Sequence, residues 1–321
     1  MSGESAGAPP LIVVAGATAT GKTELAIRLA EAIEREGRPV EIISADSRQV
    51  FRGLDIGTAK ASASDRARVT HHGLDLVDPD EPFSVADFVE HATGALSDLG
   101  RRAGVAILAG GTGLYLRSVA GGLDTDSLPN DPSIRMRLEA EFEAGGIAPM
   151  AERLVAAAPQ LAATVDLRNP RRVVRALEIA EIGGDGPRPP ARGYPGQSVW
   201  LGVHVDPAAH RARIAARANA QFDAGLIEEA GALRERFDPA LPAFSAIGYR
   251  EAWAVLDGGT TREEAIELDA RRNVAFARRQ RTWFRSEPGI TWLDATEALP
   301  TAPALELTRR ATGAGGRSGT S

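Results

Sequence analysis

The eight residues Gly16–Thr23 restrict the fold of this chain more than any other segment. They read Gly-Ala-Thr-Ala-Thr-Gly-Lys-Thr and match the phosphate-binding pattern G-x-x-x-x-G-K-[ST]. This pattern needs a strand before it and a helix after it. Leu11–Ala15 is a short apolar run typical of a strand buried on both faces, and Leu25, Leu29 and Ile33 recur at helical spacing. The segment therefore predicts a strand, a phosphate-binding loop and a helix.

Every residue of this loop is a candidate for binding a diphosphate or a nucleotide. The glycines allow backbone N–H groups to converge on a phosphate, and the N-terminus of the next helix adds partial positive charge. Lys22 is expected to reach a terminal phosphate oxygen, and the hydroxyl of Thr23 is expected to hold Mg²⁺. The candidate residues are Gly16, Ala17, Thr18, Ala19, Thr20, Gly21, Lys22 and Thr23.

Val105–Ala109 is another apolar run, and the residues that follow it differ from those of common nucleoside-triphosphate hydrolases. Those proteins usually carry a magnesium-binding Asp at the end of such a strand, whereas Gly110 and Gly111 follow here. Hydrolysis of a nucleoside triphosphate is therefore disfavoured. The glycines permit close approach of a ligand, and Thr112 and Tyr115 offer hydroxyls. A tight turn packed against the phosphate-binding loop is the alternative.

Apolar periodicity predicts the other elements of the chain. Strands are expected at Val40–Ile43, Val105–Ala109 and Trp200–Val205. Helices are expected at Thr23–Gly37, Ser133–Glu143, Pro149–Ala157, Arg171–Ile182, Pro207–Phe237, Ala246–Leu256 and Arg262–Arg285. Strands that alternate with helices predict an α/β fold with a parallel sheet flanked by helices.

This pattern divides the chain into a core and an insertion. Residues 10–123 and 197–300 are expected to form the α/β core with its C-terminal helices. Residues 124–196 carry helical patterns and turn residues without a strand, which predicts an all-helical insertion. The ends, 1–9 and 301–321, are small and polar or rich in Gly, Ala, Ser and Thr, and are expected to be flexible.

Composition excludes several classes of protein. The chain has no cysteine, which excludes thiolate chemistry, and no apolar run reaches the about 18 residues that span a membrane. We see no signal peptide and expect a cytoplasmic protein. A net charge of −6 argues against general nucleic-acid binding, so any such binding needs local basic patches. Only Lys22 and Lys60 of the 37 basic residues are lysines, so each lysine invites a specific explanation.

Asp46 follows the strand Val40–Ile43, at the edge where parallel sheets collect ligands. It is a candidate general base, with a helix N-cap as the alternative. Lys60 is either a phosphate contact or a surface residue.

Two arginine clusters supply local basic patches. One is Arg168–Arg175, and the other is Arg271–Arg285, in which Phe276, Trp283 and Phe284 are interleaved with six arginines. Arginine and aromatic side chains together clamp phosphates and stack on unpaired bases. An amphipathic helix with salt bridges to acidic residues elsewhere is the alternative for each cluster.

Taken in order, these motifs resemble the tRNA dimethylallyltransferase family. The resemblance covers most of the chain from Leu11 to Asp294. It rests on Gly16–Thr23, Asp46–Arg52, Asp55–Lys60, His71–Asp75 with Asp78-Pro79, Gly110–Tyr115, Asn169–Glu178, Ala246–Glu251 and Arg278–Arg285. It implies a P-loop core that binds dimethylallyl diphosphate with Mg²⁺, and a helical insertion that grips the anticodon stem-loop of tRNA.

The resemblance also implies roles for individual residues. The dimethylallyl group moves to the exocyclic amine of the adenosine 3′ of the anticodon, in tRNAs that read codons beginning with U. Asp46 is the general base, Lys22 and Thr23 act on the diphosphate, and the protein is expected to be a monomer. The implied tRNA contacts are Asp46, Ser47, Arg48, Gln49, Thr112, Arg171, Arg172, Val173, Val174, Arg175, Ser245, Ala246, Ile247, Gly248, Tyr249, Arg250, Arg278, Arg279, Gln280, Arg281, Thr282, Trp283, Phe284 and Arg285.

Three residues depart from the family's usual pattern. Phe51 replaces Tyr, Arg278 replaces Lys, and Ala17 replaces a common Pro, and none of these changes removes a catalytic group. Two other functions remain open on the residues alone. One is a P-loop kinase or an adenylate dimethylallyltransferase that acts on a small nucleotide. The other is an RNA-binding module without activity, against which the intact loop and Asp46 count.

Overall fold

A computed structural model describes residues 7–123, 129–186 and 191–312 of the chain. They form two compact units: unit 1 consists of Met1–Gly122 with Gly193–Ser321, and unit 2 is Leu123–Arg192. The expectation of a flexible N-terminus falls mostly on residues 1–6, which lie outside the described residues.

The chain returns to unit 1 slightly before the predicted end of the insertion at residue 196. The backbone N–H of Gly193 donates to the Gly121 carbonyl at 3.1 Å. The Tyr194 hydroxyl donates to the Pro9 carbonyl at 2.7 Å. Both contacts lie within unit 1, at and just after the point where the chain returns to it.

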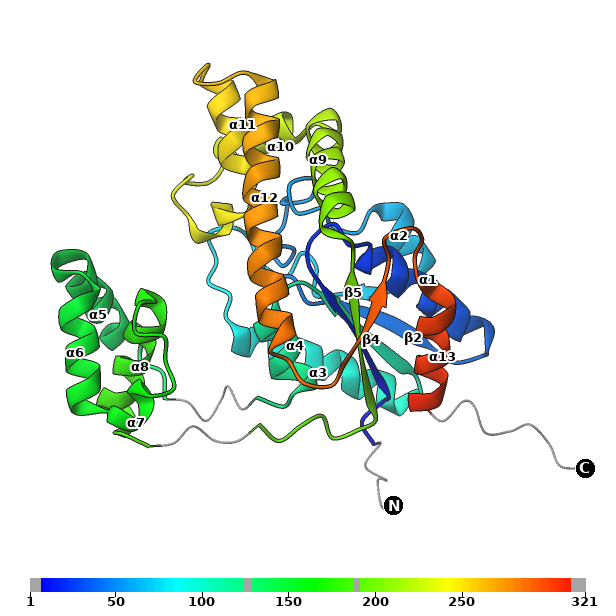
Figure 1. The fold of residues 1–321 in the computed structure, drawn as a ribbon, viewed down its shortest axis with the longest axis horizontal. Helices are drawn as coiled ribbons and strands as arrows, with labels where there is room; N and C mark the ends of the chain where they lie inside the picture. Colours follow the sequence, from blue (N-terminus) through cyan, green and yellow to red (C-terminus); the bar gives the residue numbers. More distant parts are fainter. Residues whose placement is uncertain (1–6, 124–128, 187–190, 313–321) are drawn as a thin grey trace, which may run out of the picture. The chain divides into compact units, whose positions relative to one another are not determined.

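A six-stranded sheet with parallel neighbours forms the centre of unit 1, in the order β3-β2-β4-β1-β5-β6 (Figure 1). The strands are β1 (Leu11–Gly16), β2 (Val40–Ser44), β3 (His71–His72), β4 (Val105–Gly110), β5 (Ser198–His204) and β6 (Ile290–Asp294). All residues of β1 are buried, and they alternate between the two apolar layers of the core because successive side chains of a strand point to opposite faces. The expected α/β fold with a parallel sheet is confirmed.

Helices cover both faces of this sheet. α1 (Lys22–Arg35) and α13 (Thr301–Ala311) pack on one face, and α3 (Val85–Arg101) and α4 (Gly113–Ala120) pack on the other (Figure 1). The remaining helices of unit 1 are α2 (Ala63–Arg68), α9 (Pro207–Asp223), α10 (Leu226–Arg234), the 3-10 helix η1 (Pro242–Ser245), α11 (Tyr249–Leu256) and α12 (Arg262–Arg285). α9 and α12 contact each other and lie over the phosphate-binding loop.

Two expectations about unit 1 are wrong. The single helix expected over Pro207–Phe237 is divided into α9 and α10, because Gly225 between them has a φ of +102° that ends a right-handed helix. The expected flexible segment 301–321 begins with α13, whose Ala304 and Thr308 are buried against unit 1. Burial of one apolar helix face outweighs the small-residue composition that suggested flexibility. Residues 313–321 lie outside the described part of the chain.

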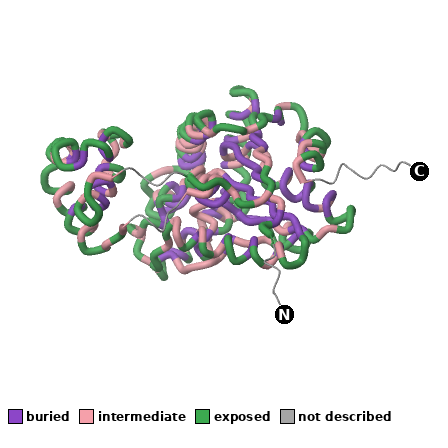
Figure 2. Tube along the Cα trace, turned by 90° about the horizontal axis from the view of Figure 1, so that it is seen from below, coloured by how far each residue is buried: buried purple, intermediate pink, exposed green. Residues whose placement is uncertain are grey.

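Unit 2 is helical, as the sequence predicts for most of this segment. Its helices are α5 (Pro132–Gly145), α6 (Ile147–Ala157), α7 (Pro159–Ala162) and α8 (Pro170–Gly183). They enclose an apolar core of their own, which includes Leu138, Leu154 and Leu177. Figure 2 shows buried residues inside each unit. Among the described residues, no helix is both long enough and apolar enough to cross a membrane.

Candidate active site at the phosphate-binding loop

The loop between β1 and α1 has the geometry of an anion cradle. Two of its residues, Ala19 and Gly21, have left-handed backbones with φ of +58° and +90°. The Ala17 carbonyl accepts hydrogen bonds from the Thr20 hydroxyl at 3.0 Å and from Lys22 Nζ at 2.5 Å. The N-terminus of α1 points its free N–H groups into the loop. The prediction of a strand, a loop and a helix is confirmed here.

The Lys22 ammonium occupies a site that favours a bound anion. Burial and, to a lesser extent, the positive charge of Arg217 lower the pKa of Lys22 to about 8, although the carboxylate of Asp46 acts in the opposite direction. At neutral pH the ammonium is therefore still charged but poorly compensated. A diphosphate bound in the loop would supply the missing negative charge.

The donors around Thr23 fit a magnesium ion that is shared with a substrate. Thr23 is exposed on the first turn of α1. The described residues contain no group of three His, Asp or Glu that could hold a metal ion by themselves. Mg²⁺ is commonly held by one or two protein ligands together with phosphate oxygens and water. One hydroxyl beside a diphosphate cradle matches that pattern.

Three side chains from α9 and α12 hold Thr18 in the middle of the loop. Gln280 Oε1 accepts from the Thr18 backbone N–H at 2.8 Å, and Arg217 Nη1 donates to the Thr18 hydroxyl at 2.6 Å. His210 Nε2 lies 2.7 Å from the Thr18 carbonyl, and its Nδ1 lies 3.2 Å from Arg281 Nη1. Burial lowers the pKa of His210, so the neutral ring donates to Thr18 and accepts from Arg281.

Arg217 is a site residue that the sequence analysis did not find. Burial lowers the pKa of its guanidinium, while the carboxylates of Asp46 and Asp269 act in the opposite direction. Its Nε is buried and has no hydrogen-bond partner among the described residues. A buried donor without a partner calls for an explanation, and an anion in the loop would supply the acceptor that this Nε lacks. His210 and Arg217 are seven residues apart, which places them on the same face of one helix, and this spacing was the signal in the sequence that could have identified Arg217.

Asp46 lies opposite these cations, just after β2. It does not cap a helix, because the described helix that follows it along the chain, α2, is capped by Ser62. Instead, one of its oxygens accepts from the Arg48 backbone N–H at 2.9 Å and closes a turn. Ser47 N–H donates to the Thr112 hydroxyl at 3.0 Å, which ties the segments after β2 and β4 together. Asp46 is half-buried.

Gln280 links the phosphate-binding loop to the segment after β4. Its amide group accepts from Thr18 and donates to the Gly111 carbonyl at 3.0 Å. Gly113 lies against the Trp283 ring, since an added Cβ would come within 2.3 Å of it. Tyr115 is buried and stacks on Phe88 with ring centroids 4.0 Å apart, and burial raises its pKa to about 12. Tyr115 therefore belongs to the packed core, and Gly110–Tyr115 shows the packing that its sequence allowed, while close approach of a ligand stays a prediction.

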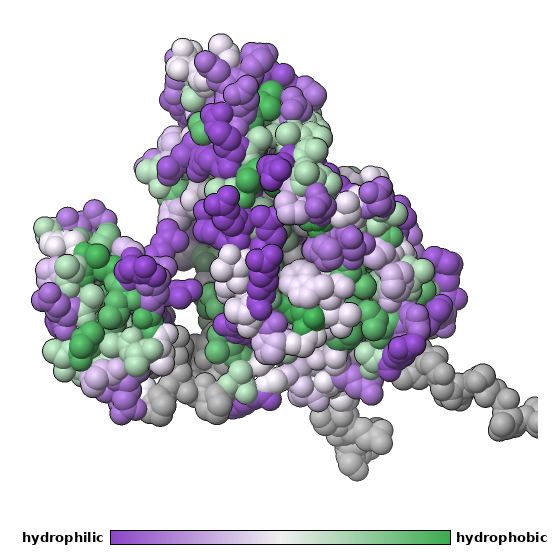
Figure 3. All heavy atoms as spheres, viewed as in Figure 1, coloured by the Kyte–Doolittle hydropathy of each residue, from purple (hydrophilic) through white to green (hydrophobic). Residues whose placement is uncertain are grey.

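The arginines of α12 fall into two groups with different surroundings. Arg271 and Arg272 form ion pairs with Glu267 and Glu251, which is the structural alternative for these two residues. Beyond them, Arg278, Arg281 and Arg285 line a cavity of about 620 Å³ next to the ends of β5 and β6. In Figure 3, hydrophilic side chains are spread over this face of unit 1 with apolar ones between them.

Several predicted tRNA contacts have buried side chains. Val173 and Val174 lie in the core of unit 2, and Tyr249, Gln280 and Phe284 lie in unit 1 with at most 7% of each residue exposed. These side chains pack inside their units, so only their backbones and exposed neighbours are left for RNA, and their assignment as tRNA contacts stays a prediction. The predicted contacts that are exposed are Arg171, Arg172, Ser245, Arg250, Arg278, Arg279, Thr282 and Arg285.

The remaining predicted contacts are half-buried or lie in the backbone of a turn. Trp283 stacks under Arg117, with the guanidinium carbon 4.4 Å from the ring centroid. Arg175 forms an ion pair with the buried Glu178 at 2.8 Å. The other half-buried contacts are Ser47, Arg48, Gln49, Thr112, Ile247 and Arg281, whereas Ala246 and Gly248 are buried in the turn before α11.

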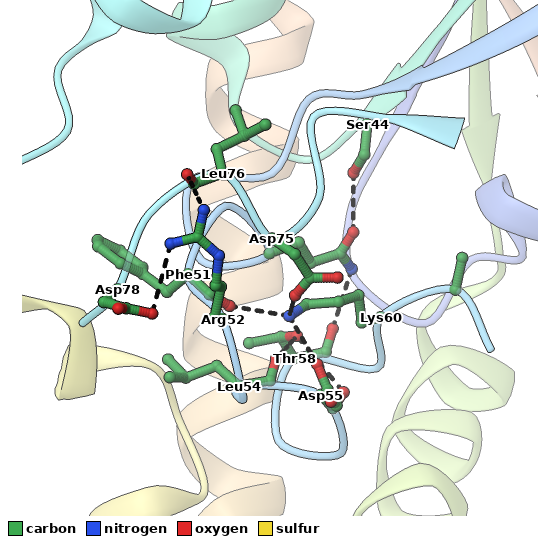
Figure 4. A network of polar contacts seen from close by, with 12 residues as sticks. Ser44, Phe51, Arg52, Leu54, Asp55, Thr58, Lys60, Asp75, Leu76 and Asp78 are labelled. Carbon is green, nitrogen blue, oxygen red and sulfur yellow. Dashed lines mark hydrogen bonds and ion pairs between the residues drawn. The ribbon is translucent and has the colours of Figure 1, made fainter. Parts of the chain in front are cut away.

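Lys60 fits neither of the two roles that were predicted for it. Its side chain is only 1% exposed, and its ammonium forms ion pairs with Asp55 and Asp75, both at 2.6 Å (Figure 4). It is therefore neither a surface residue nor a free phosphate ligand.

The fold and this site together define a P-loop transferase, in which a cationic cradle for a diphosphate lies opposite a carboxylate. Residues 49–287 match the family model described as IPP transferase. The chain belongs to the IPP transferase family.

Similar proteins support this assignment over most of the chain. A tRNA dimethylallyltransferase of Thermus thermophilus is 43% identical over 282 residues, which cover 86% of this chain and 90% of that protein. One of Synechococcus sp. is 40% identical over 295 residues, 92% of each chain. A solved tRNA isopentenylpyrophosphate transferase of Bacillus halodurans is 36% identical with a TM-score of 0.68, and covers 95% of this chain and 96% of its own. A eukaryotic dimethylallyltransferase solved in the course of acting on tRNA is 26% identical with a TM-score of 0.75, over 90% of this chain and 74% of its own.

Proposed function

We propose that this protein transfers the dimethylallyl group of dimethylallyl diphosphate to the exocyclic amine of the adenosine 3′ of the anticodon in tRNA, and releases diphosphate. The acceptors are tRNAs that read codons beginning with U. One observation carries the proposal: Lys22 and Arg217 bond the phosphate-binding loop at the Ala17 carbonyl and the Thr18 hydroxyl, and the turn that bears Asp46 is tied through Ser47 to Thr112 beside this loop. A cationic pocket for a diphosphate and a carboxylate base therefore share one site.

The proposed reaction uses these groups as follows. The bond between the allylic carbon and the diphosphate oxygen breaks, and its electron pair leaves with the diphosphate. The adenosine amine bonds to that carbon, and its proton passes to the Asp46 carboxylate. Lys22, Arg217 and the N–H groups of the loop stabilise the negative charge on the leaving oxygens. Mg²⁺, held by Thr23 and the diphosphate, would neutralise part of the same charge.

Asp46 suits the role of base because, among the residues that the structure describes, hydrogen bonds are found to only one of its two oxygens, the one that closes the turn. An adenine amine is a weak nucleophile, so removal of its proton as the new bond forms lowers the barrier. General-base assistance of this kind is typically worth about 10²- to 10⁴-fold in rate. The adenosine must leave its stack to reach Asp46, at a cost of a few kcal/mol that RNA contacts offset.

We also propose that exposed arginines bind the anticodon stem-loop. Arg171 and Arg172 in unit 2, and Arg250, Arg279 and Arg285 in unit 1, are exposed. Within the described residues, no carboxylate lies within 4 Å of any of these five, so they are available to phosphates. The proposed enzyme acts as a monomer in the cytoplasm.

A transfer assay tests the proposal directly. The full-length protein is incubated with labelled dimethylallyl diphosphate, Mg²⁺ and either unmodified tRNA or AMP. We expect label in tRNA at the adenosine 3′ of the anticodon. Label in AMP alone would instead establish an adenylate dimethylallyltransferase, and label in neither acceptor would refute prenyl transfer.

The role of Asp46 needs a separate variant. Asp46→Asn keeps the shape of the side chain and its acceptor for the Arg48 N–H, but it cannot take a proton. We expect tRNA affinity near that of the unchanged protein and a single-turnover rate lower by about 10²- to 10⁴-fold. An unchanged single-turnover rate would exclude Asp46 as the base.

A further inference from the structure

Lys60 is buried beneath the turn that carries Asp46, and the reaction above gives it no role. Its Nζ donates to the Phe51 carbonyl at 2.8 Å, to Asp55 Oδ1 at 2.6 Å and to Asp75 Oδ1 at 2.6 Å (Figure 4). An ammonium has three N–H donors, so these contacts use all of them. A planar guanidinium cannot direct its donors toward three acceptors around one point. This geometry accounts for a lysine in a chain that otherwise uses arginine.

The acceptors of Lys60 belong to two segments that also pair through their backbones. Asp75 N–H donates to the Gln49 carbonyl at 3.1 Å, and Leu76 N–H donates to the Val50 carbonyl at 2.7 Å. Burial alone would raise the pKa of Asp75, but hydrogen bonds from Lys60 and Arg66 hold it below its usual value. Asp75 is therefore a charged anchor for Lys60.

The same network reaches the end of β2 through Gln49. The Ser44 hydroxyl donates to Gln49 Oε1 at 2.8 Å. Gln49 Nε2 donates to the carbonyls of Thr58 at 3.1 Å and Ala59 at 3.3 Å, directly before Lys60. The turn from Asp46 to Phe51 is thus held by β2 at its start and by Lys60 at its end.

The segment that bears Lys60 is itself fixed to α9 and α10. The Glu229 carboxylate accepts from the backbone N–H groups of Asp55, Ile56 and Gly57 at 2.8 to 3.2 Å. Gln221 Nε2 donates to the Ile56 carbonyl at 2.6 Å. Because these contacts do not involve Lys60, loss of its ammonium leaves its own segment in place. It removes the side-chain bond to the Phe51 carbonyl, and only the backbone pairing with the segment after Asp75 then holds that end of the turn.

We infer that Lys60 is a positioning residue: by holding the Phe51 carbonyl and Asp75, it sets the turn that presents Asp46 to the amine of the acceptor. Lys60 does not touch either substrate. The inference rests on the proposed role of Asp46, and the experiment separates failure of one from failure of the other.

Two variants remove the lysine in different ways. Lys60→Met keeps an unbranched apolar stem without charge, and Lys60→Arg keeps the charge but changes its geometry. At temperatures well below the melting point of each variant, we expect both to slow single turnover at saturating substrates by about 10- to 100-fold, the effect of displacing a catalytic group by about 1 Å. The KM for dimethylallyl diphosphate should change by less than about twofold, because the phosphate-binding loop stays in place.

The matched control is Ile33→Ala, which removes buried apolar volume from the other layer of the core. It should lower the melting temperature while leaving the single-turnover rate at the same temperature unchanged. If Ile33→Ala slows turnover as much as Lys60→Met at equal loss of stability, the effect of Lys60 is general and the inference fails.

A double-variant cycle with Ser44→Ala gives the decisive readout. Ser44 and Lys60 hold the same turn from its two ends, so their effects on the single-turnover rate should not be independent. We expect Ser44→Ala to slow the Lys60→Met variant by a smaller factor than it slows the unchanged protein. Strictly multiplicative effects would overturn the inference. A normal rate in Lys60→Met beside a slow Asp46→Asn would overturn this inference alone, whereas a normal rate in Asp46→Asn would overturn the base assignment and this inference with it.

Discussion

Replacement of Arg217 by methionine tests whether the diphosphate pocket extends from the phosphate-binding loop to α9. Arg217 Nη1 donates to the Thr18 hydroxyl at 2.6 Å, and its buried Nε has no partner among the described residues. We expect that Nε to donate to a leaving diphosphate oxygen. A charge-assisted hydrogen bond of this kind is worth about 1.5–3 kcal/mol. At 1.36 kcal/mol for each tenfold in rate, kcat/KM should fall by about 10- to 150-fold.

The assay is steady-state transfer of label from dimethylallyl diphosphate to tRNA, with Arg211→Met as the matched control. Arg211 is exposed on the same helix, and no side-chain contact of it is found among the described residues, so kcat/KM should change by less than about twofold. The pH dependence of binding gives a second readout, because the charge of Arg217 acts on the pKa of Lys22. Arg217 lowers the pKa of Lys22, so removal of Arg217 should raise that pKa above about 8.

The pH above which affinity for dimethylallyl diphosphate falls, the alkaline limb of the binding profile, should therefore be higher in Arg217→Met than in the unchanged protein. An unchanged kcat/KM would refute the contact between Arg217 and the diphosphate. An alkaline limb that moves to lower pH would refute the electrostatic coupling to Lys22.

Two further predictions concern the same loop. In the unchanged protein, affinity for dimethylallyl diphosphate should fall as the pH rises through about 8, because the Lys22 ammonium is charged below its pKa and neutral above it; calorimetric titration checks this, and Lys22→Met should bind weakly without that pH dependence. Gln280→Leu leaves the Thr18 N–H and the Gly111 carbonyl without their partner, which should lower the free energy of unfolding by about 1–3 kcal/mol in urea and speed hydrogen exchange at Thr18. Unchanged exchange at Thr18 would contradict the bridging role of Gln280.

Much of the fold was predictable because its signals are local. The strand–loop–helix unit around Gly16–Thr23 depends on an apolar run, two glycines and one helical period, all within about 25 residues. α12 was expected at Arg262–Arg285, where the structure places it, since Thr261 caps its start and apolar residues recur along it. The elements that were not predicted include β3, β6, α2, α3, α4 and α13. β3 and β6 are short edge strands that are completed only by packing on unit 1, whereas the capping box at Ser84 was an available signal for α3.

The arginine clusters show the limit of pattern reading. The exposure of a residue could not be predicted from its neighbours in the sequence. Val173 and Phe284 lie among arginines in the sequence, but the helical repeat places their side chains in the cores of units 2 and 1. Arg271 and Arg272 find acidic partners on the same helix and on α11, which a search for acids within Arg271–Arg285 did not include. The free charge available to a partner is therefore smaller than the sequence count.

The sequence by itself determined the phosphate-binding loop, the parallel α/β core, the inserted helical unit and the family, because each depends on residues near one another in the chain. Only the tertiary structure decided what surrounds that loop. Gln280 and Arg217 reach Thr18 across 262 and 199 residues of sequence, and Lys60 meets Asp75 only because the chain folds back beside β2. Contacts of that range carry no periodic signal, since they arise when separately predictable elements pack against one another.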